Sequence, residues 1–160
     1  MIRAATTQDV DELLRLEHAC FEHDLLKRSD FRNALRATKS LLLVKDDGGK
    51  LAAYALLRMQ GRKGHLLSLA VDPEARRRGL GRALIGAVEE AALARGARHM
   101  QLELREDNGA AEALYASLGY RHHGTWLAYY EDESDAHCMQ KILTGEPPPE
   151  PHNHVGFEIR

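Results

Sequence analysis

Apolar and polar positions follow two different periods along the chain, and each period predicts one type of element. Continuous or alternating apolar runs, with a period of two, predict strands over residues 2–5, 41–44, 51–58, 65–71, 99–105, 120–126 and 136–142. Apolar residues spaced three and four apart predict helices that begin near residues 7, 29, 80 and 108. The order of these elements, β-α-α-β-β-β-α-β-α-β-β, predicts a mixed α/β sheet with helices on its faces.

The first predicted helix has an apolar stripe that we expect to face the core. The stripe consists of Val10, Leu13, Leu14, Leu16 and Ala19.

Turn residues separate the elements and place one boundary near the end of the chain. The run Asp46–Gly49 predicts a hairpin between the second and third strands. From Thr144 onward the periodic pattern stops, and Pro147–Pro149 and Pro151 favour extended backbone. We therefore expect one domain over residues 1–143, followed by a proline-rich tail over residues 144–160.

Composition limits the class of protein. A chain of 160 residues is long enough to bury roughly 70% of its unfolded surface. The 22 basic and 24 acidic residues nearly cancel, which does not favour a nucleic-acid partner. No apolar run reaches the roughly 20 residues that span a bilayer, and the N-terminal residues lack the apolar core of a signal peptide. The two cysteines, Cys20 and Cys138, are too few for a disulfide framework. We expect a cytoplasmic protein without a membrane partner.

Nine histidines raise the question of a metal site. The pairs His122-His123 and His152-x-His154 have no cysteine or acidic partner at the spacing that zinc sites use. We expect no metal.

Residues Leu66–Ala87, LLSLAVDPEARRRGLGRALIGA, combine a strand, a basic loop, a glycine turn and the start of a helix. The first N–H groups of a helix have no partner within it, and the helix dipole places partial positive charge there. Glycines let an anion approach the backbone, and the arginines of Arg76–Arg78 attract it. The stretch therefore favours a site for a small polyanion such as a phosphate ester. An ordinary strand–turn–helix with solvated arginines is the alternative.

Two motifs in this order resemble the GNAT family of N-acetyltransferases. LAVDPEARRRGLGRAL is similar to its first motif, in which Arg76, Gly79 and Gly81 occupy the signature positions. LELREDNGAAEALYASLGY is similar to its second motif, with Asn108 and Tyr115 in register. The segment YYEDESDAHCMQKI resembles the closing strands of ribosomal-protein alanine acetyltransferases and of archaeal N-terminal acetyltransferases. The resemblance covers residues 2–143. It implies the GNAT fold, a mixed sheet of six to seven strands flanked by about four helices.

The resemblance also implies acetyl-CoA as the donor of the acetyl group. In this family the strand before the first motif pairs with the pantetheine arm, and the following loop binds the pyrophosphate through backbone N–H groups. A residue of the second motif contacts the pantetheine. The matching residues in this sequence are Leu69, Ala70 and Val71 for the strand, Arg77, Arg78, Gly79, Leu80, Gly81 and Arg82 for the loop, and Asn108 for the second motif.

Glu103 is the candidate for the general base that takes a proton from the acceptor amine. Alternation along its strand turns it away from the face of Leu102 and Leu104. In the ribosomal-protein acetyltransferases the matching carboxylate is assigned as the base, either directly or through water. The alternative is a solvated carboxylate paired with Arg105 or Arg121.

Tyr115 is the candidate for the general acid that protonates the departing thiolate, a role that the family match implies. The alternative is a core aromatic beside Leu114 and Leu118. The thioester carbonyl would be polarised by a backbone N–H group, for which Val71 is the candidate.

The acceptor is less well determined. Tyr129 and Tyr130 match the paired tyrosines that line the entrance for the peptide N-terminus in N-terminal acetyltransferases, although a packing role is equally open. Glu22 and Asp24 could bind a cationic acceptor, but the turn lacks the Pro-Trp of the ribosomal-protein type. We predict direct acetyl transfer to a protein N-terminal α-amine by a monomer or homodimer. The alternatives are transfer to a small-molecule amine or a lysine side chain, and an acyl-CoA-binding module without turnover.

Overall fold

The computed structural model describes residues 1–145, so residues 146–160 of the predicted tail lie outside the described residues. The described part contains a seven-stranded sheet, four α-helices and two 3₁₀ turns. This architecture confirms the prediction of a mixed α/β sheet with six to seven strands and about four helices. The elements are β1 (Ile2–Ala4), η1 (Thr7–Asp9), α1 (Val10–Cys20), α2 (Arg28–Arg36), β2 (Ser40–Asp47), β3 (Lys50–Gln60), β4 (Lys63–Val71), η2 (Pro73–Ala75), α3 (Leu80–Ala94), β5 (His99–Arg105), α4 (Gly109–Ser117), β6 (Arg121–Trp126) and β7 (Ala136–Ile142).

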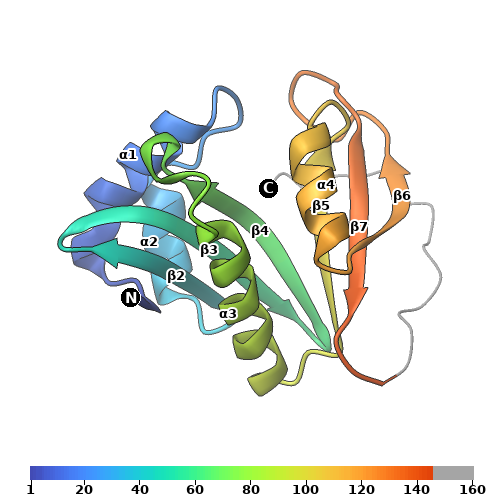
Figure 1. Cartoon of the computed structure of the whole chain (residues 1–160), viewed down its shortest axis with the longest axis horizontal. Coiled ribbons are helices and arrows are strands. Elements are labelled where there is room, and N and C mark those ends of the chain that lie inside the picture. The colour runs from blue at the N-terminus through green and yellow to red at the C-terminus, as the bar shows by residue number, and fades with distance from the viewer. Residues whose placement is uncertain (146–160) are drawn as a thin grey trace.

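The sheet has the strand order β1-β2-β3-β4-β5-β7-β6, and its helices cover both faces (Figure 1). All neighbouring strands are antiparallel except β4 and β5. Residues of α1 and α2 pack with one core cluster, and residues of α3 and α4 pack with the other, on the opposite side of the sheet. The two faces are called the α1/α2 face and the α3/α4 face below.

The sheet opens between β4 and β5. These strands pair over four positions only, from Lys63 opposite His99 to Leu66 opposite Leu102. Beyond this point β4 continues to Val71 and β5 to Arg105, and the two strands diverge (Figure 1). The second half of β4 therefore has no strand partner on its β5 side, which leaves room for another molecule.

A β-bulge in β4 changes which side chains face which core. Leu57 of β3 lies opposite Leu66, and Leu56 lies opposite Ser68, so Leu67 is the extra residue. Leu66 packs in the cluster of the α3/α4 face, whereas Leu67 packs against the cluster of the α1/α2 face. Because Ser68 bonds to Tyr54 of that second cluster, Leu67 and Ser68 both point to the α1/α2 face.

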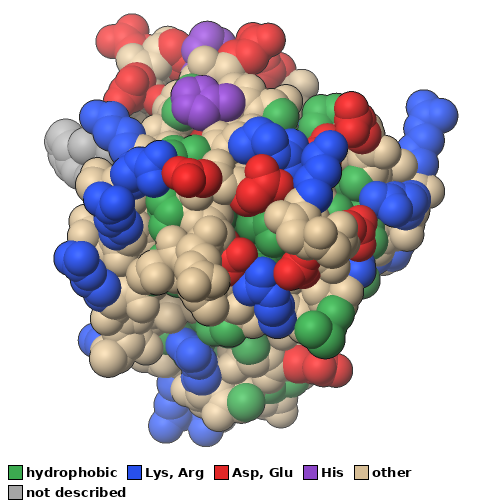
Figure 2. Space-filling view, turned by 90° about the vertical axis from the view of Figure 1, so that its left-hand side faces the viewer, with side chains coloured by type: hydrophobic (Ala, Val, Ile, Leu, Met, Phe, Trp, Pro, Cys, Tyr) green, Lys and Arg blue, Asp and Glu red, His purple; other side chains and the backbone are tan. Residues whose placement is uncertain are grey.

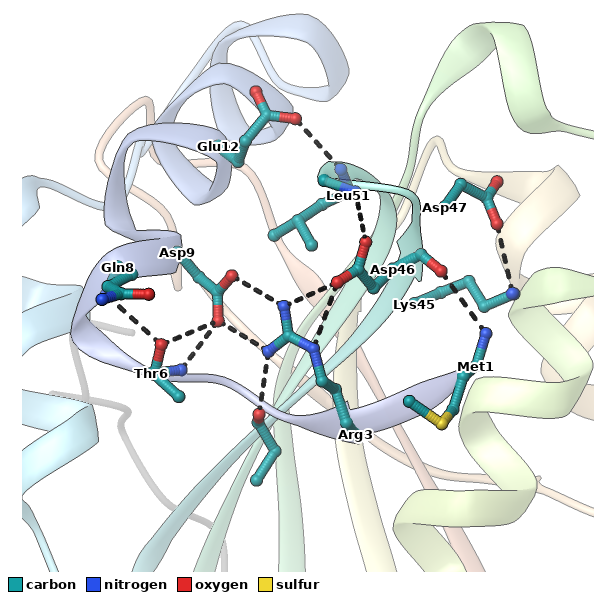
Figure 3. Close-up of polar contacts among 12 residues, drawn as sticks. Met1, Arg3, Thr6, Gln8, Asp9, Glu12, Lys45, Asp46, Asp47 and Leu51 are labelled. Carbon is teal, nitrogen blue, oxygen red and sulfur yellow. Dashed lines mark hydrogen bonds and ion pairs between the residues drawn. The ribbon is translucent and has the colours of Figure 1, made fainter.

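The edge strand β1 is held to the sheet by a group of ion pairs (Figure 3). The Arg3 guanidinium donates to Asp9 at 2.8 and 2.9 Å and to Asp46 of β2 at 2.9 and 3.3 Å. The Arg3 hydrogen bonds lower the pKa of Asp9, and so does the Thr6 backbone N–H, which donates to the same carboxylate in a capping box. These contacts fix the start of α1 against β2.

The outer surface carries charges of both signs. Figure 2 shows acidic and basic side chains next to one another in the middle of the face that forms the left-hand side of Figure 1. Within residues 1–145, no helix combines the length and the apolar character needed to cross a bilayer.

Candidate active site

A cavity of about 500 Å³ lies where the N-terminus of α3 faces α4, and we call it the donor cavity. Most of the residues predicted to bind the cofactor line it, namely Leu69, Val71, Arg77, Gly79, Leu80, Gly81, Arg82 and Asn108. Two others lie elsewhere. Ala70 is buried in the core of the α1/α2 face, and the Arg78 side chain lines a neighbouring cavity beside Asp47.

The N-terminus of α3 is open toward the donor cavity. Its N-cap residue is Gly79, whose φ of +74° favours glycine, and no side chain caps the helix. By contrast, the Asn108 side chain caps α4, with its Oδ1 accepting from the Ala111 N–H at 3.2 Å. The first N–H groups of α3, at Leu80 and Gly81, therefore lie at a cavity without a side-chain partner at the cap, an arrangement that suits phosphate.

The arginines at this cavity and beside it keep their positive charge largely uncompensated. Arg76 donates to the Val71 carbonyl at 3.2 Å, and Arg82 donates to the Ser117 hydroxyl at 2.8 Å. Arg78 has one carboxylate neighbour, Asp47, at 3.5 Å. Because neutral oxygens accept most of these hydrogen bonds, the donor cavity favours an anion.

A second cavity, of about 170 Å³, occupies the gap between β4 and β5, and we call it the central cavity. It is lined by Leu66–Leu69 of β4, Leu102–Arg105 of β5 and Tyr115 of α4, together with residues of three loops. Leu69 and Asn108 line both the donor cavity and the central cavity. The two cavities are therefore adjacent, and one ligand can extend from the first into the second.

Glu103 lies on the α1/α2 face, and its carboxylate lines the central cavity. Its Oε2 lies 2.5 Å from His65 Nε2, and its Oε1 accepts from Gln101 at 2.8 Å. The expected partners Arg105 and Arg121 do not bind Glu103 among the described residues. Arg105 binds two other carboxylates, and Arg121 is exposed. Burial raises the pKa of Glu103, but hydrogen bonds from His65, Gln101 and Trp126 and the charge of His65 outweigh it, so the net pKa is lowered.

His65 is a site residue that the sequence analysis missed. Its side chain is 3% exposed, compared with 8% for that of Glu103, and its Nδ1 has no hydrogen-bond partner among the described residues. His65 stands opposite Gln101 in the parallel pairing of β4 and β5, two positions before Glu103. The imidazole reaches the carboxylate only because of this pairing register. The sequence does not show the register, so a single histidine in an apolar strand could not be predicted to contact Glu103.

Tyr115 approaches the central cavity from the α3/α4 face, opposite to Glu103. Its ring meets Tyr120 edge-on at 5.5 Å, and the Tyr120 hydroxyl donates to Glu89 at 2.9 Å. No described residue forms a hydrogen bond with the Tyr115 hydroxyl. Burial raises the pKa of Tyr115, so the phenol keeps its proton at neutral pH and can donate it in the cavity.

Arg105, at the end of β5, connects two loops on the α1/α2 face. It donates to Asp24 of the α1–α2 loop at 2.6 Å and to Asp132 of the β6–β7 loop at 2.8 Å. Its guanidinium also lies 4.3 Å from the centre of the Tyr130 ring, which in turn meets Tyr129 edge-on. The carboxylate of Asp24, which the sequence analysis considered for a cationic acceptor, is therefore engaged by an arginine.

A third cavity, of about 570 Å³, lies outside these loops, and we call it the outer cavity. Tyr129 and Tyr130 line both the outer and the central cavity. Its lining residues include three carboxylates, of Asp24, Asp30 and Glu131, and one cation, Lys27. Glu22 is exposed and lines none of the three cavities.

Comparison with known proteins agrees with this geometry. The model of the acetyltransferase (GNAT) family matches residues 7–120. The ribosomal-protein-S18-alanine N-acetyltransferase of Escherichia coli is 29% identical, with a TM-score of 0.82 over 92% of this chain and 96% of that chain. The ribosomal-protein-alanine N-acetyltransferase of Brucella melitensis is 26% identical, with a TM-score of 0.76 over 89% of this chain and 99% of that one.

A third structure was solved with coenzyme A. The PaiA N-acetyltransferase of Thermoplasma acidophilum, in complex with coenzyme A, is 15% identical, with a TM-score of 0.76 over 89% of this chain and 98% of that chain. At this identity the similarity concerns the fold.

Proposed function

Because the chain belongs to the acetyltransferase (GNAT) family, we propose that it transfers an acetyl group from acetyl-CoA to a protein N-terminal α-amine, in the manner of the ribosomal-protein alanine acetyltransferases. The two ribosomal-protein relatives, at 29% and 26% identity, support this acceptor class. The family membership itself makes the protein an acetyltransferase, so a binding module without turnover is not favoured.

One observation carries the proposal: three cavities follow one another through the gap in the sheet. Leu69 and Asn108 are shared by the donor and central cavities, and Tyr129 and Tyr130 are shared by the central and outer cavities. A donor and an acceptor can therefore enter from opposite sides and meet between β4 and β5. Direct attack of an amine on a thioester requires such a meeting point.

The donor cavity suits acetyl-CoA in charge and shape. The open N-terminus of α3 and the arginines around it would bind the pyrophosphate, with Gly79 and Gly81 allowing close approach. The unpaired part of β4, including Leu69 and Val71, would bind the pantetheine arm through its backbone. In this arrangement the thioester would lie in the central cavity.

The two candidate catalytic groups then lie on opposite faces of the sheet, as the reaction needs. Glu103, held ionised by its hydrogen bonds, would attract the acceptor ammonium group on the α1/α2 face and take up its proton. Tyr115, which keeps its proton, would donate it to the leaving thiolate on the α3/α4 face. The roles of both residues remain predictions.

The outer cavity supports a peptide acceptor. Asp24 is engaged by Arg105, so Asp30 and Glu131 are the carboxylates of this cavity that would favour a cationic acceptor. The size of the cavity and its position outside Tyr129 and Tyr130 leave space for residues that follow the N-terminal one. A small-molecule amine would use the same carboxylates but would not need this outer space.

The proposal is tested with a peptide library incubated with acetyl-CoA and analysed by mass spectrometry. The library varies the N-terminal residue among alanine, serine, methionine and lysine, and each peptide has a matched control with a blocked N-terminus. We expect acetylation of the free α-amine and none of the blocked peptide. Acetylation of a lysine side chain or of small amines in preference to every α-amine would contradict the proposed acceptor class.

A further inference from the structure

A row of buried polar side chains leads away from the central cavity on the α1/α2 face. Ser68 lines the cavity, and its Oγ lies 2.8 Å from the Tyr54 hydroxyl. The Tyr54 hydroxyl donates to the Glu17 carboxylate, which also accepts from the Leu26 backbone N–H at 3.2 Å. Ser68, Tyr54 and Glu17 are all buried. These contacts join the cavity to a carboxylate in α1.

The β-bulge at Leu67 creates this row. If β4 alternated strictly through Leu66, Leu67 and Ser68, with no bulge, Ser68 would lie on the α3/α4 face with Leu66. With it, Ser68 lies beside Tyr54 of β3, whose ring is held edge-on by Phe31 of α2 at 5.5 Å. Bulges often redirect a side chain beside an active site, and this one turns Ser68, which lines the cavity, toward Tyr54.

The hydrogen bonds in the row have a direction that depends on one proton. An ionised Glu17 only accepts, so the Tyr54 proton points to it, and the Tyr54 oxygen accepts the Ser68 proton. The Ser68 oxygen then offers its lone pairs to the cavity. When Glu17 is protonated, both bonds reverse and Ser68 offers its proton instead.

We propose that Ser68, Tyr54 and Glu17 form a second acceptor for the proton of the incoming ammonium group, beside Glu103; this inference rests on the acetyl transfer proposed above. The N–H bond of the ammonium breaks, and its proton binds Ser68 Oγ. At the same time the Ser68 proton moves to the Tyr54 oxygen and the Tyr54 proton moves to Glu17. The products are a neutral amine, whose electron pair attacks the thioester, and a neutral Glu17 carboxyl group. The proton later returns to the cavity by the reverse path.

Glu17 and Glu103 are placed for different tasks. Both carboxylates accept two hydrogen bonds that favour the charged form, Glu103 from His65 and Gln101, and Glu17 from Tyr54 and the Leu26 N–H. Glu17 lies in the last turn of α1, where the negative end of the helix dipole favours the protonated form of a carboxyl group. Glu103 therefore attracts the ammonium group and can take up its proton directly, and Glu17 is the second group that can hold this proton.

Titratable and charged groups face this row from several elements. On α1, burial raises the pKa of Cys20, a shift to which the charge of Glu17 also contributes, so the thiol stays neutral at neutral pH. The other groups come from the loop after β4, the α1–α2 loop, β4 and β5, and they are Asp72, Arg76, His23, His65, Glu103 and Arg105. These are present in every variant below, so they affect the compared profiles equally.

The decisive variant is Tyr54→Phe, which removes one hydroxyl and keeps the ring in the core. The assay uses acetyl-CoA and an alanine-terminated peptide from about pH 6 to about pH 9.5, a range that brackets the pKa of an α-amine. We expect kcat to fall about 10- to 100-fold near pH 6.5 and to recover as the amine loses its own proton at high pH. The KM for acetyl-CoA should not change. Ser68→Ala and Glu17→Gln should give profiles of the same shape.

Tyr120→Phe is the matched control. It removes a hydroxyl–carboxylate bond, to Glu89, from an equally buried tyrosine on the other face. Because Tyr120 lies outside the row, any loss of rate in this variant should be the same at every pH.

Two results would overturn the inference. One is a set of Tyr54→Phe and Ser68→Ala profiles that coincide with the wild-type profile, with no loss of rate near pH 6.5. The other is a loss that high pH does not restore, which would assign these residues a structural role only. Ser68→Ala keeps the test decisive if Tyr54→Phe does not fold. Wild-type protein that binds coenzyme A but acetylates no peptide would overturn the proposed function, and this inference with it.

Discussion

The donor side and the acceptor side of the gap between β4 and β5 are built in different ways. The donor side comes mostly from one continuous stretch, Val71–Arg82, and offers backbone N–H groups and arginines with little compensation by carboxylates. The acceptor side is assembled from two loops and β5, and its charges are already paired, as in Arg105 with Asp24 and Asp132. The donor side is therefore prepared for a strongly charged ligand, and the acceptor side for a ligand that is selected by fit.

This difference predicts that a single change on the donor side has the largest effect. Gly81→Glu places a negative side chain at the open N-terminus of α3, where an added Cβ would meet Val71 and Leu114 at ordinary van der Waals distances, so the fold should tolerate the change. We expect the affinity for coenzyme A, measured by calorimetry, to fall by more than about 100-fold, since a repulsive charge replaces an attractive site. Gly86→Glu on the exposed side of the same helix is the control and should bind normally. Unchanged affinity in Gly81→Glu would place the phosphate site elsewhere.

Tyr115→Phe tests the candidate general acid for the leaving thiolate on the donor side. The variant loses the proton that the thiolate needs, so kcat should fall by about 10²-fold or more. Burial raises the pKa of Tyr115, which keeps the phenol protonated throughout the assay range, so the loss should be the same from about pH 6 to about pH 9.5. A loss that disappears at high pH would be inconsistent with a general acid.

Glu103→Gln makes the same comparison on the acceptor side. The net pKa of Glu103 is lowered, so the wild-type carboxylate is ionised throughout the assay range and loses its charge only as the pH falls through that lowered value. We expect kcat/KM to fall about 10- to 100-fold near pH 6.5 and to recover as the pH approaches the pKa of the amine, about 8. If this profile and that of Tyr115→Phe had the same shape, the assignment of base and acid to opposite faces would be wrong.

Arg105→Met tests whether the paired charges hold the acceptor loops. It removes the ion pairs to Asp24 and Asp132 and keeps most of the apolar stem. We expect the KM for the peptide to rise by about tenfold, equivalent to about 1.4 kcal/mol, with no change in the KM for acetyl-CoA. Arg121→Met, at an exposed position of β6, serves as the control. A change in the KM for acetyl-CoA instead would show that the two sides are not separate.

Asn108→Ala should have the smallest effect of these variants, and we measure it as a loss of stability. It removes the cap of α4, and loss of such a cap costs about 1 kcal/mol of the free energy of unfolding. Urea denaturation measures the loss, and Asn108→Asp, which retains a capping oxygen, should recover most of it. A destabilisation well above 2 kcal/mol would mean that Asn108 does more than cap the helix.

The donor side was predictable because its information is local. The strand, the basic loop, the glycines and the helix follow one another in the sequence, and β5 and β7 have the predicted bounds, 99–105 and 136–142. The residues at the acceptor side depend on register. His65 reaches Glu103 only through the parallel pairing of β4 and β5, and Ser68 reaches Tyr54 only because of the bulge.

The first helix also contains a buried residue that depends on a contact distant in the sequence. The predicted apolar stripe included Ala19, but Ala19 is exposed, and Glu17 is buried instead. Glutamate is charged, so a stripe predicted from apolar residues does not include it. Its burial can be recognised only when its hydrogen-bond partner is known. Here the partner is Tyr54, which lies 37 positions away in the sequence.

The short seam between β4 and β5 has a consequence for the order in which the substrates bind. The two parts of the sheet meet over four residue pairs, and the unpaired end of β4 leaves backbone groups available to a ligand. A donor bound there, as proposed above, would supply the missing hydrogen bonds and fix the distance between the two strands before an amine arrives. The acceptor, in contrast, would find its binding surface complete only after the donor has fixed the distance between β4 and β5. We therefore expect an ordered sequence, with acetyl-CoA binding first and the acceptor second.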